Sequence, residues 1–331
     1  MNNRPTQELT MVEAINRALA WELAADPEVI VFGEDVGRDG GVFRTTAGLL
    51  DRFGAERVRD TPLSETLIAG LAVGMAAQGL KPVAEIQFMG FIYPAIDHLL
   101  NHASRLRNRT RGRLSCPMVL RTPCGAGIHA PEHHSEHTET LLIHIPGLRV
   151  VCPSTPARAY GLLLAAIRDP DPVVFLEPTR IYRLMKQRIE DDGAALPLDC
   201  CFISREGTDV TLVAWGAALH DTLAAAEALA AAGIEAEVID CATLKPLDTA
   251  TILESVQKTG RCVIVHEAAR TLGLGAEIAA VLAERGLLSL LAPVERVTGY
   301  DTVIPLYRLE KYYLPSVARI VEAARRCLAY D

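Results

Sequence analysis

The fold is decided by one stretch, DTPLSETLIAGLAVGMAA from Asp60 to Ala77, together with the apolar segment PVAEIQF from Pro82 to Phe88. Ser64 is suited to cap a helix, because its hydroxyl can accept a hydrogen bond from a free amide of the first turn. This cap places Glu65 in the first helical turn. The segment from Pro82 to Phe88 is typical of a buried strand. A helix leading into such a strand predicts an α/β unit.

The same alternation of strands and helices continues on both sides of this stretch. In the first part of the chain we expect strands at 29–32, 118–120, 148–151 and 173–176. We expect one helix after Thr10, which has capping-box spacing with Glu13, and further helices at 95–109 and from Pro156 to about Arg168. In the second part we expect strands at 210–215, 236–241 and 262–266, and helices at 219–232, 250–258, 277–284 and about 315–328. Strands that are continuous apolar runs predict parallel sheets covered by helices on both faces.

The chain length and a change of pattern together indicate two domains. A chain of 331 residues is too long for one ordinary core. The alternation weakens around residues 185–208, where a charged turn is followed by an irregular segment. We therefore predict an α/β protein with one parallel-sheet domain at 1–190, a linker at 191–205 and a second, smaller parallel-sheet domain at 206–331.

Composition excludes several classes of function. The net charge of −8 argues against a nucleic-acid partner, which normally calls for a basic stripe. No apolar stretch is long enough to span a membrane, and the opening MNNRP has no apolar core, so we expect neither a membrane anchor nor a signal peptide. The eight cysteines are scattered and form no C-x-x-C pair, as expected for reduced core residues of a cytoplasmic protein.

The helix that follows Ser64 has unusually little side-chain bulk. Gly70 and Gly74 each cost roughly 1 kcal/mol relative to alanine in a helix, so helix propensity does not explain them. Small residues four positions apart allow another helix to approach closely. We therefore expect a tight helix–helix contact here, with a subunit interface as one location for it. On its own, Glu65 is also compatible with a simple interaction with the helix dipole.

A second candidate segment runs from Thr122 to His137 and follows a strand. Four histidines and two glutamates lie within nine residues, from His129 to His137. Three interpretations are open: a metal site that uses His133 and His137, acid–base chemistry by one histidine, or a solvated polar loop. Pro131 and the glycines favour a loop over the helix that a hydrolytic zinc motif requires.

The sequence contains no loop built to hold a diphosphate. We find neither G-x-x-x-x-G-K-[ST] nor a strand followed by G-x-G-x-x-G, and no Gly-Asp-Gly followed by asparagine about thirty residues later, the magnesium–diphosphate signature of thiamine enzymes. A weaker candidate for a cation is the turn from Arg168 to Pro172, where two carboxylates follow a helix end.

Many segments, in order, resemble the β subunit of heterotetrameric, thiamine-diphosphate-dependent 2-oxo acid dehydrogenases of the pyruvate and branched-chain types. They cover nearly the whole chain: DTPLSE (60–65), AGLAVG (69–74), EIQF (85–88), HS (134–135), PGL (146–148), AIRD (166–169), PVVFLEP (172–178) and RVTGYD (296–301). The resemblance implies a transketolase-like pyrimidine-binding domain followed by a transketolase C-terminal-type domain. It also implies an α2β2 tetramer whose α subunit holds Mg²⁺ and the diphosphate, and a contact with the dihydrolipoyl acyltransferase core.

The resemblance assigns roles to individual residues. Glu65 matches the glutamate that shares a proton with the aminopyrimidine ring of thiamine diphosphate, and Leu63, Gln87 and Phe91 match positions that line the pyrimidine pocket. Phe91 stands where branched-chain members often have tyrosine. His134 matches the histidine that faces lipoamide and donates a proton during reductive acylation. His129, His133 and His137 have no role to transfer and are expected as polar loop residues.

A potassium site is also implied by the resemblance. The corresponding positions are Met118, Ala166, Ile167, Asp169 and Asp171. Asp171 replaces an asparagine of the relatives, and Pro170 is a further departure.

The resemblance therefore implies oxidative decarboxylation of a 2-oxo acid, pyruvate or a branched-chain one, with acyl transfer to lipoamide. Two alternatives remain open at this stage: the β subunit of an acetoin dehydrogenase, and a non-catalytic assembly subunit of the same fold. A zinc hydrolase using the histidine loop is a third and less favoured reading.

Overall fold

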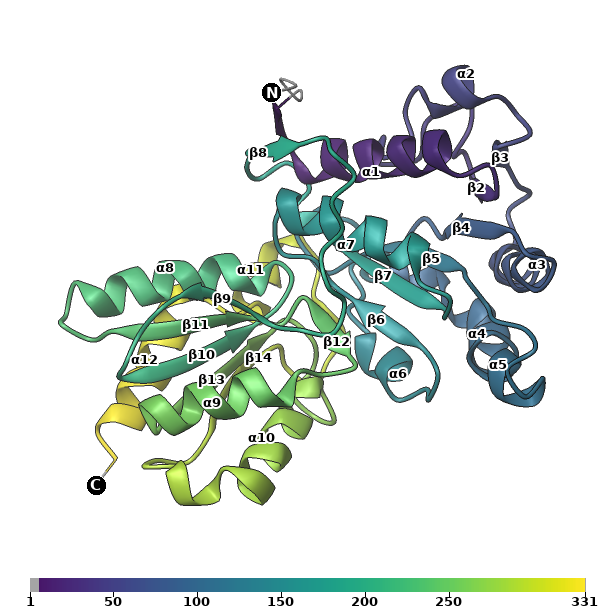
Figure 1. Ribbon diagram of the computed structural model, residues 1–331. Helices are drawn as coiled ribbons and strands as arrows, with labels where there is room; N and C mark the ends of the chain where they lie inside the picture. Colours follow the sequence, from purple (N-terminus) through teal and green to yellow (C-terminus); the bar gives the residue numbers. More distant parts are fainter. Residues whose placement is uncertain (1–5, 331) are drawn as a thin grey trace, which may run out of the picture.

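The computed structural model describes residues 6–330 and places them in two α/β domains (Figure 1). The first domain contains a seven-stranded sheet and the second a five-stranded sheet. Both sheets are mainly parallel, so the expected α/β class with two parallel-sheet domains is confirmed. Among the described residues, no helix combines the length and the apolar character needed to cross a membrane.

The first sheet has the strand order β12-β6-β7-β5-β4-β2-β3. Six of its strands are mutually parallel: β2 (Val29–Gly33), β3 (Val58–Asp60), β4 (Lys81–Glu85), β5 (Val119–Cys124), β6 (Arg149–Val151) and β7 (Val173–Pro178). The seventh, β12 (Thr243–Lys245), comes from much later in the chain and pairs antiparallel with β6. All carboxyl ends of the six parallel strands therefore lie at one edge of the sheet.

Helices cover both faces of this sheet, as the apolar strands predict. Helices α1 (Met11–Ala25) and α7 (Pro156–Arg168) pack on one face with Val31 and Val83, whereas α3 (Glu65–Ala77) and α4 (Ile96–Asn101) pack on the other with Phe32 and Ala84. The alternation follows from the strand geometry, in which successive side chains point to opposite faces. Helix α1 starts with the expected capping box, in which Thr10 and Glu13 satisfy each other's backbone amides.

The expected helix at 95–109 is broken into short pieces. These are η2 (Tyr93–Ala95), α4, η3 (Ala103–Arg105) and α5 (Leu106–Arg109). His102 leaves the helical region, with φ −122° and ψ −66°, and the Asn101 carbonyl accepts a hydrogen bond from the Arg109 guanidinium. The main chain of Gly147 also packs directly against Ser104. One contact within the segment and one with the distant Gly147 therefore accompany the break in the helix.

The second sheet has the order β14-β13-β10-β11-β9. Its strands are β9 (Phe202–Arg205), β10 (Val210–Ala214), β11 (Ala236–Asp240), β13 (Cys262–His266) and β14 (Glu295–Thr298), and only the edge strand β9 is antiparallel to its neighbour. Helices α8 (Ala218–Ala230) and α12 (Val317–Leu328) cover one face, and α9 (Thr249–Thr259) and α10 (Leu274–Arg285) cover the other.

The two domains are joined by more than their linker. The strand β1 (Thr6–Leu9) pairs with β8 (Gln187–Glu190) at the end of the first domain, and β9 enters the second sheet from within the segment 191–205. Strand β12 then returns to the first sheet, and one apolar core runs from Leu120 and Val150 of the first domain to Trp215 and Ile239 of the second. The domains are therefore packed together.

Candidate active site

The carboxyl ends of β2, β3, β4 and β5 bring three sequence-predicted residues and Glu34 to one edge of the first sheet. Glu34 directly follows β2, Glu65 opens α3 after β3, Gln87 follows β4, and the loop that carries His134 follows β5. Ligands of open parallel sheets bind beyond the carboxyl ends of the strands. The topology therefore places these four side chains at the edge where a ligand site is expected.

Glu65 begins α3 as the sequence predicted. Ser64 is the helix N-cap, and its hydroxyl accepts a hydrogen bond from the amide of Leu67 at 3.4 Å. The Glu65 side chain is partly buried and lies close enough to Glu34 to affect its ionisation. The Ser64 cap and the strand order together place the Glu65 carboxylate at the edge of the sheet.

Glu34 is a site residue to which the sequence analysis gave no role. Burial raises the pKa of the Glu34 carboxyl, and the nearby charges of Glu65 and Asp35 raise it further. Its Oε1 is buried and has no hydrogen-bond partner among the described residues. Buried polar atoms are rarely left unpaired, so this oxygen indicates a place where a further polar group binds. The sequence signal for this residue is the acidic pair Glu34 and Asp35, which directly follows a buried strand.

Gln87 and Leu63 have different surroundings. The Gln87 amide donates hydrogen bonds to the Asp35 carboxylate at 3.0 Å and to the Glu34 carbonyl at 3.5 Å, which ties the end of β4 to the end of β2. Leu63 is 81% exposed, although it is a large apolar side chain. Leu63 therefore contacts little within this chain and is available to another molecule.

His134 packs into a small aromatic cluster with Phe88 and Phe91. Its ring centroid lies 4.4 Å from that of Phe88 and 5.3 Å from that of Phe91, both in edge-to-face geometry. The Nδ1 atom of His134 is buried without a hydrogen-bond partner in the described chain. The structure thus brings Phe91 and His134 together, and Phe91 follows Gln87 by four residues.

Gly90 allows the two loops of this cluster to meet. A Cβ atom at position 90 would lie 2.0 Å from the carbonyl oxygen of His133 and 2.8 Å from its carbonyl carbon. Real Cβ atoms do not approach backbone atoms so closely, and any other residue would push the loops apart. The position of His134 against Phe88 and Phe91 therefore depends on this glycine.

A buried network of ion pairs lies within the first sheet, next to the edge that carries these residues. The Arg121 guanidinium donates to both carboxylate oxygens of Glu177, at 2.7 and 3.1 Å, and to Glu85 at 2.9 Å. Tyr182 donates to Glu177 at 2.6 Å, and Thr45 donates to Glu85 at 3.2 Å. Burial alone would lower the pKa of Arg121, but the two carboxylates raise it above its ordinary value. The network therefore links charged residues of the adjacent strands β4, β5 and β7.

The histidine loop is not a uniformly solvated segment. His137 lies in the loop as expected, but its side chain is buried, with 3% exposed, so the solvated interpretation does not hold for it. Its Nδ1 lies 2.5 Å from the Glu139 carboxylate. Burial alone would lower the pKa of His137, but Glu139 raises it to about 10. His133, in contrast, is 62% exposed, and among the described residues no cluster of three or more possible metal ligands contains both His133 and His137, which does not favour the metal pair considered above.

The residues considered for potassium lie at the opposite edge of the sheet. Met118 precedes β5, and Asp169 and Asp171 precede β7, so they are at the amino ends of these strands. Arg107 pairs with Asp171 at 2.6 Å and Arg149 pairs with Asp169 at 3.1 Å. The Met118 carbonyl accepts a hydrogen bond from Val173. Both carboxylates are therefore already paired with arginines.

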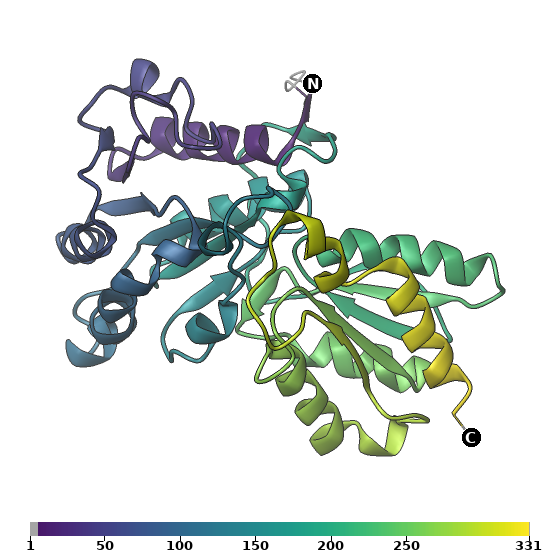
Figure 2. The same cartoon turned by 180° about the vertical axis from the view of Figure 1, so that it is seen from behind.

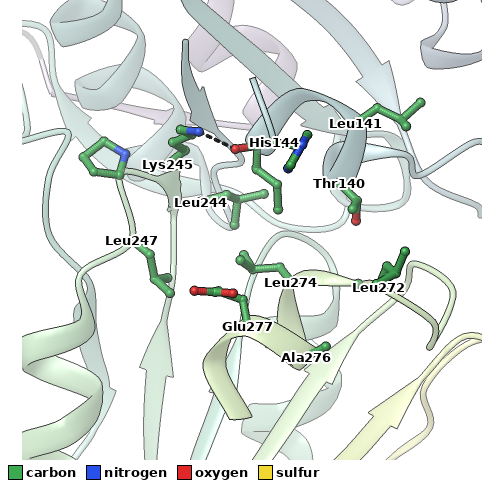
Figure 3. Close-up of a pocket in the computed structure, with 13 residues that line it drawn as sticks. Thr140, Leu141, His144, Leu244, Lys245, Leu247, Leu272, Leu274, Ala276 and Glu277 are labelled. Atoms are coloured by element: carbon green, nitrogen blue, oxygen red, sulfur yellow. Dashed lines mark hydrogen bonds between the residues drawn. The ribbon is translucent and has the colours of Figure 1, made fainter. Parts of the chain in front are cut away.

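A cleft of about 840 Å³ lies between the domains, away from Glu65 and His134. Figure 3 shows its mainly leucine walls, with Leu244 and Leu247 on one side and Leu272 and Leu274 near α10. Lys245 is turned away from its centre and donates to the Ile143 carbonyl at 2.5 Å. Catalytic sites need converging polar groups, and this cleft has few, so we do not assign the chemistry to it.

Helix α3 presents an apolar outer surface. It lies at the outer end of the first domain, far from the second domain in both views (Figures 1 and 2). Leu67 and Leu71 are 46% and 43% exposed, and a Cβ added at Gly74 would meet nothing within 4 Å. On the inner side, Gly70 packs against the His98 ring of α4, where a Cβ would lie 3.0 Å from the ring. Gly70 thus allows a close contact within the chain, whereas Gly74 leaves an open surface on the helix.

Comparison with known proteins identifies the family. Residues 7–185 match the transketolase pyrimidine-binding domain and residues 201–320 match the transketolase C-terminal domain. The chain is 49% identical over 318 residues to the pyruvate dehydrogenase E1 component subunit beta of Acholeplasma laidlawii, covering 96% of this chain and 97% of that protein. It is 46% identical to the Bacillus subtilis protein of the same name, covering 98% and 99%.

The chain belongs to the family of 2-oxo acid dehydrogenase β subunits. A solved structure titled as a split-gene transketolase, inactive beta4 tetramer, matches with a TM-score of 0.80 and 24% identity, covering 98% of this chain and 99% of that one, which supports the fold alone. The family implies thiamine diphosphate as cofactor. The unpaired Glu34 oxygen, the adjacent Glu65 and the exposed Leu63 fit the polar and apolar parts of an aminopyrimidine ring.

Proposed function

We propose that this β subunit forms one half of a pyruvate-decarboxylating dehydrogenase site whose other half comes from an α subunit. The observation that carries the proposal is the position of Glu65, at the start of a helix whose outer surface is apolar and exposed and beside the buried carboxyl group of Glu34. A site that opens onto such a surface is completed by a second polypeptide. The sequence has no diphosphate-binding loop, which also supports a site shared between an α and a β subunit.

In this proposal Glu65, Gln87, Phe91 and Leu63 hold the aminopyrimidine ring of thiamine diphosphate. The bound cofactor supplies the electron sink for decarboxylation of the 2-oxo acid. Glu65 holds a proton against a ring nitrogen, which is the task that a fixed carboxyl group at the site edge can perform. Phe91 and the exposed Leu63 exclude water from the ring. The α subunit supplies the Mg²⁺ and diphosphate contacts in this arrangement.

His134 is proposed to donate a proton to lipoamide during acyl transfer. Its ring is held by Phe88 and Phe91, and its Nδ1 has no partner in the described chain. An imidazole held in this way can donate to a sulfur atom of the dithiolane as that ring opens and is reduced. The partners implied by this step are the α subunit, in an α2β2 tetramer, and the dihydrolipoyl acyltransferase core.

Pyruvate is proposed as the substrate because the relatives described above carry that name. Branched-chain 2-oxo acids and acetoin are the alternatives to be compared directly. Turnover of each compound by the reconstituted α2β2 enzyme distinguishes them, and the best substrate is the one with the highest kcat/KM. A higher kcat/KM for a branched-chain acid or for acetoin than for pyruvate would reject the pyruvate assignment.

The first test replaces Glu65 with glutamine. We expect Glu65→Gln to lose at least 100-fold in decarboxylation measured with an artificial electron acceptor, the lower end of the range for removing a general acid–base group. The tetramer should remain intact by size-exclusion chromatography. Glu56→Gln is the matched control, because the Glu56 side chain is 91% exposed. Near-normal turnover by Glu65→Gln would reject the proposed role, and no decarboxylation by the wild-type tetramer would favour a non-catalytic assembly subunit.

The second test compares His134→Ala with His133→Ala. We expect His134→Ala to reduce lipoamide-linked turnover far more than decarboxylation with an artificial acceptor, because only the former needs the proton donor. His133 is an adjacent, exposed histidine, and its replacement should leave both rates near the wild-type values. An equal loss of both rates in His134→Ala would place this residue in cofactor binding instead.

A further inference from the structure

A second cluster of reactive side chains lies behind the histidine loop and outside the proposed active site. The ligand atoms of Cys124, His137 and Cys152 all lie within 4.8 Å of one another, and all three residues are buried. They come from separate segments: the last residue of β5, the loop before α6 (Glu139–Ile143), and the residue directly after β6. The fold therefore collects two thiols and an imidazole at one point in the protein interior.

These donors are the ones that zinc prefers. Zinc binds cysteine sulfur at about 2.3 Å and histidine nitrogen at about 2.0–2.1 Å with tetrahedral geometry, which places the ligand atoms roughly 3.5–3.8 Å apart. The present separations of up to 4.8 Å need a contraction of about 1 Å, well within the reach of side-chain rotation. Cysteine and histidine together favour zinc over the harder cations that take oxygen ligands.

His137 is already oriented as zinc-binding histidines usually are. Its Nδ1 lies 2.5 Å from the Glu139 carboxylate, which leaves Nε2 for a metal. Histidines that bind metals commonly donate their other ring N–H to a carboxylate, which fixes the ring and makes the free nitrogen more basic. The second oxygen of Glu139 is buried and has no hydrogen-bond partner in the described chain, so this acid has no other evident role.

Two glycines keep side chains away from the cluster. A Cβ at Gly125 would lie 2.8 Å from Oε2 of Glu267 and 3.3 Å from Cδ2 of His137, and a Cβ at Gly216 would lie 2.9 Å from Sγ of Cys152. Gly125 therefore marks a point that is close both to the His137 ring and to a carboxylate oxygen. Glu267 is 3% exposed and lies beside the three-residue cluster but outside it, so it can become a fourth ligand only if its side chain moves toward the thiols.

We propose that Cys124, Cys152 and His137 bind a structural zinc ion, and that the neighbouring Glu267 moves in as the fourth ligand. Binding releases protons from the two thiols and from the imidazolium, because zinc takes thiolates and neutral imidazole. The two thiolates balance the charge of the zinc, and Arg180 is paired at 2.7 Å with both Glu267 and Asp221. The ion joins the ends of β5 and β6 to the loop that carries His134. The inference does not rest on the proposed function.

The test measures zinc in the purified enzyme by mass spectrometry of the metal. We expect about one zinc per chain in the wild-type α2β2 enzyme and a loss of at least tenfold in Cys124→Ser and Cys152→Ser. The control variants are Cys201→Ser and Cys241→Ser, because these thiols also lie close together, at 3.3 Å, but have no histidine in their cluster. Both control variants should keep their zinc.

Cobalt provides a second measurement that does not depend on the folding of any variant. Wild-type protein freed of metal by a chelator and then loaded with Co²⁺ should show the thiolate charge-transfer and visible absorption of a tetrahedral sulfur site. Wild-type protein with less than a tenth of an equivalent of zinc and no such cobalt spectrum would overturn the proposal. A mass lower by two hydrogens, mapped to a Cys124–Cys152 disulfide, would also overturn it.

Discussion

Replacing Gly90 with alanine tests whether the approach of two loops positions His134. The added Cβ would stand 2.0 Å from the His133 carbonyl oxygen, whereas real contacts of this kind begin at about 3.0 Å. The loops must therefore separate by about 1 Å, the difference between these two distances. The atom that is met belongs to the backbone, so a side-chain rotation cannot relieve the overlap.

Two measurable effects follow from this separation. Inserting a carbon into a packed site costs about 1–3 kcal/mol, so the thermal midpoint of Gly90→Ala should fall by several degrees. A displacement of about 1 Å of a catalytic group can cost about 100-fold in rate, and we expect a loss of this order in lipoamide-linked turnover. Decarboxylation with an artificial acceptor should also fall, through the neighbouring Phe91, but by less, because Glu65 is carried by a different loop.

Gly286→Ala is the matched control for this experiment. Gly286 has a negative φ of −117°, and the nearest atoms to an added Cβ lie at 3.1 Å, one of them the end of the Leu253 side chain. The control should therefore retain turnover in both assays. Wild-type lipoamide-linked turnover in Gly90→Ala, with an unchanged thermal midpoint, would refute the argument that this glycine sets the position of His134.

Three further predictions concern the interface, the buried network and the pH dependence of stability. Gly74→Ala should stabilise the purified β subunit by up to about 1 kcal/mol, because the added Cβ meets no atom of this chain within 4 Å. The same change should weaken assembly with the α subunit, and unchanged assembly would argue against α3 as the interface. Arg121→Met leaves Glu177 and Glu85 buried without the arginine that pairs with both of them. The free energy of unfolding measured with urea should therefore fall by about 3–5 kcal/mol. A loss below about 1 kcal/mol would contradict the importance of the network. Burial raises the pKa of Asp240 from 3.8 to about 6, so its contribution to stability is complete below pH 3.8 and is lost as the pH rises through about 6. The stability of Asp240→Asn relative to the wild type should therefore rise by about 2 kcal/mol between pH 4 and pH 7, and a difference that does not change with pH would refute this sign.

Local sequence patterns predict those parts of the fold in which short-range physics dominates. The capping box at Thr10, the Ser64 cap and the buried strands at Val29 and Val173 all appear where the sequence indicates them. Each depends on contacts within a few residues or on a continuous apolar run. The segment 95–109 was predicted wrongly as one helix, and its break is accompanied by a contact with the distant backbone of Gly147, which the local periodicity does not reveal.

The candidate site divides in the same way between local and distant information. The sequence indicates Glu65 as a first-turn acid, and its resemblance to the family suggests roles for Gln87, Phe91 and His134. It does not reveal the burial of Glu34 beside Glu65, because their proximity depends on β2 and β3 lying side by side. The burial of His137 beside Glu139, with Glu267 of the second domain nearby, is likewise not visible in the sequence, so a loop that looks solvated is partly interior.

The sequence by itself determined the α/β class, the two-domain organisation and the helix on which Glu65 stands, because periodicity and capping are properties of neighbouring residues. The tertiary structure alone decided which acids are buried, which loops meet at Gly90 and how β12 returns to the first sheet. These features arise when residues far apart in the chain are excluded from water together. No local pattern encodes that exclusion, since it depends on the strand order and on the packing of both domains.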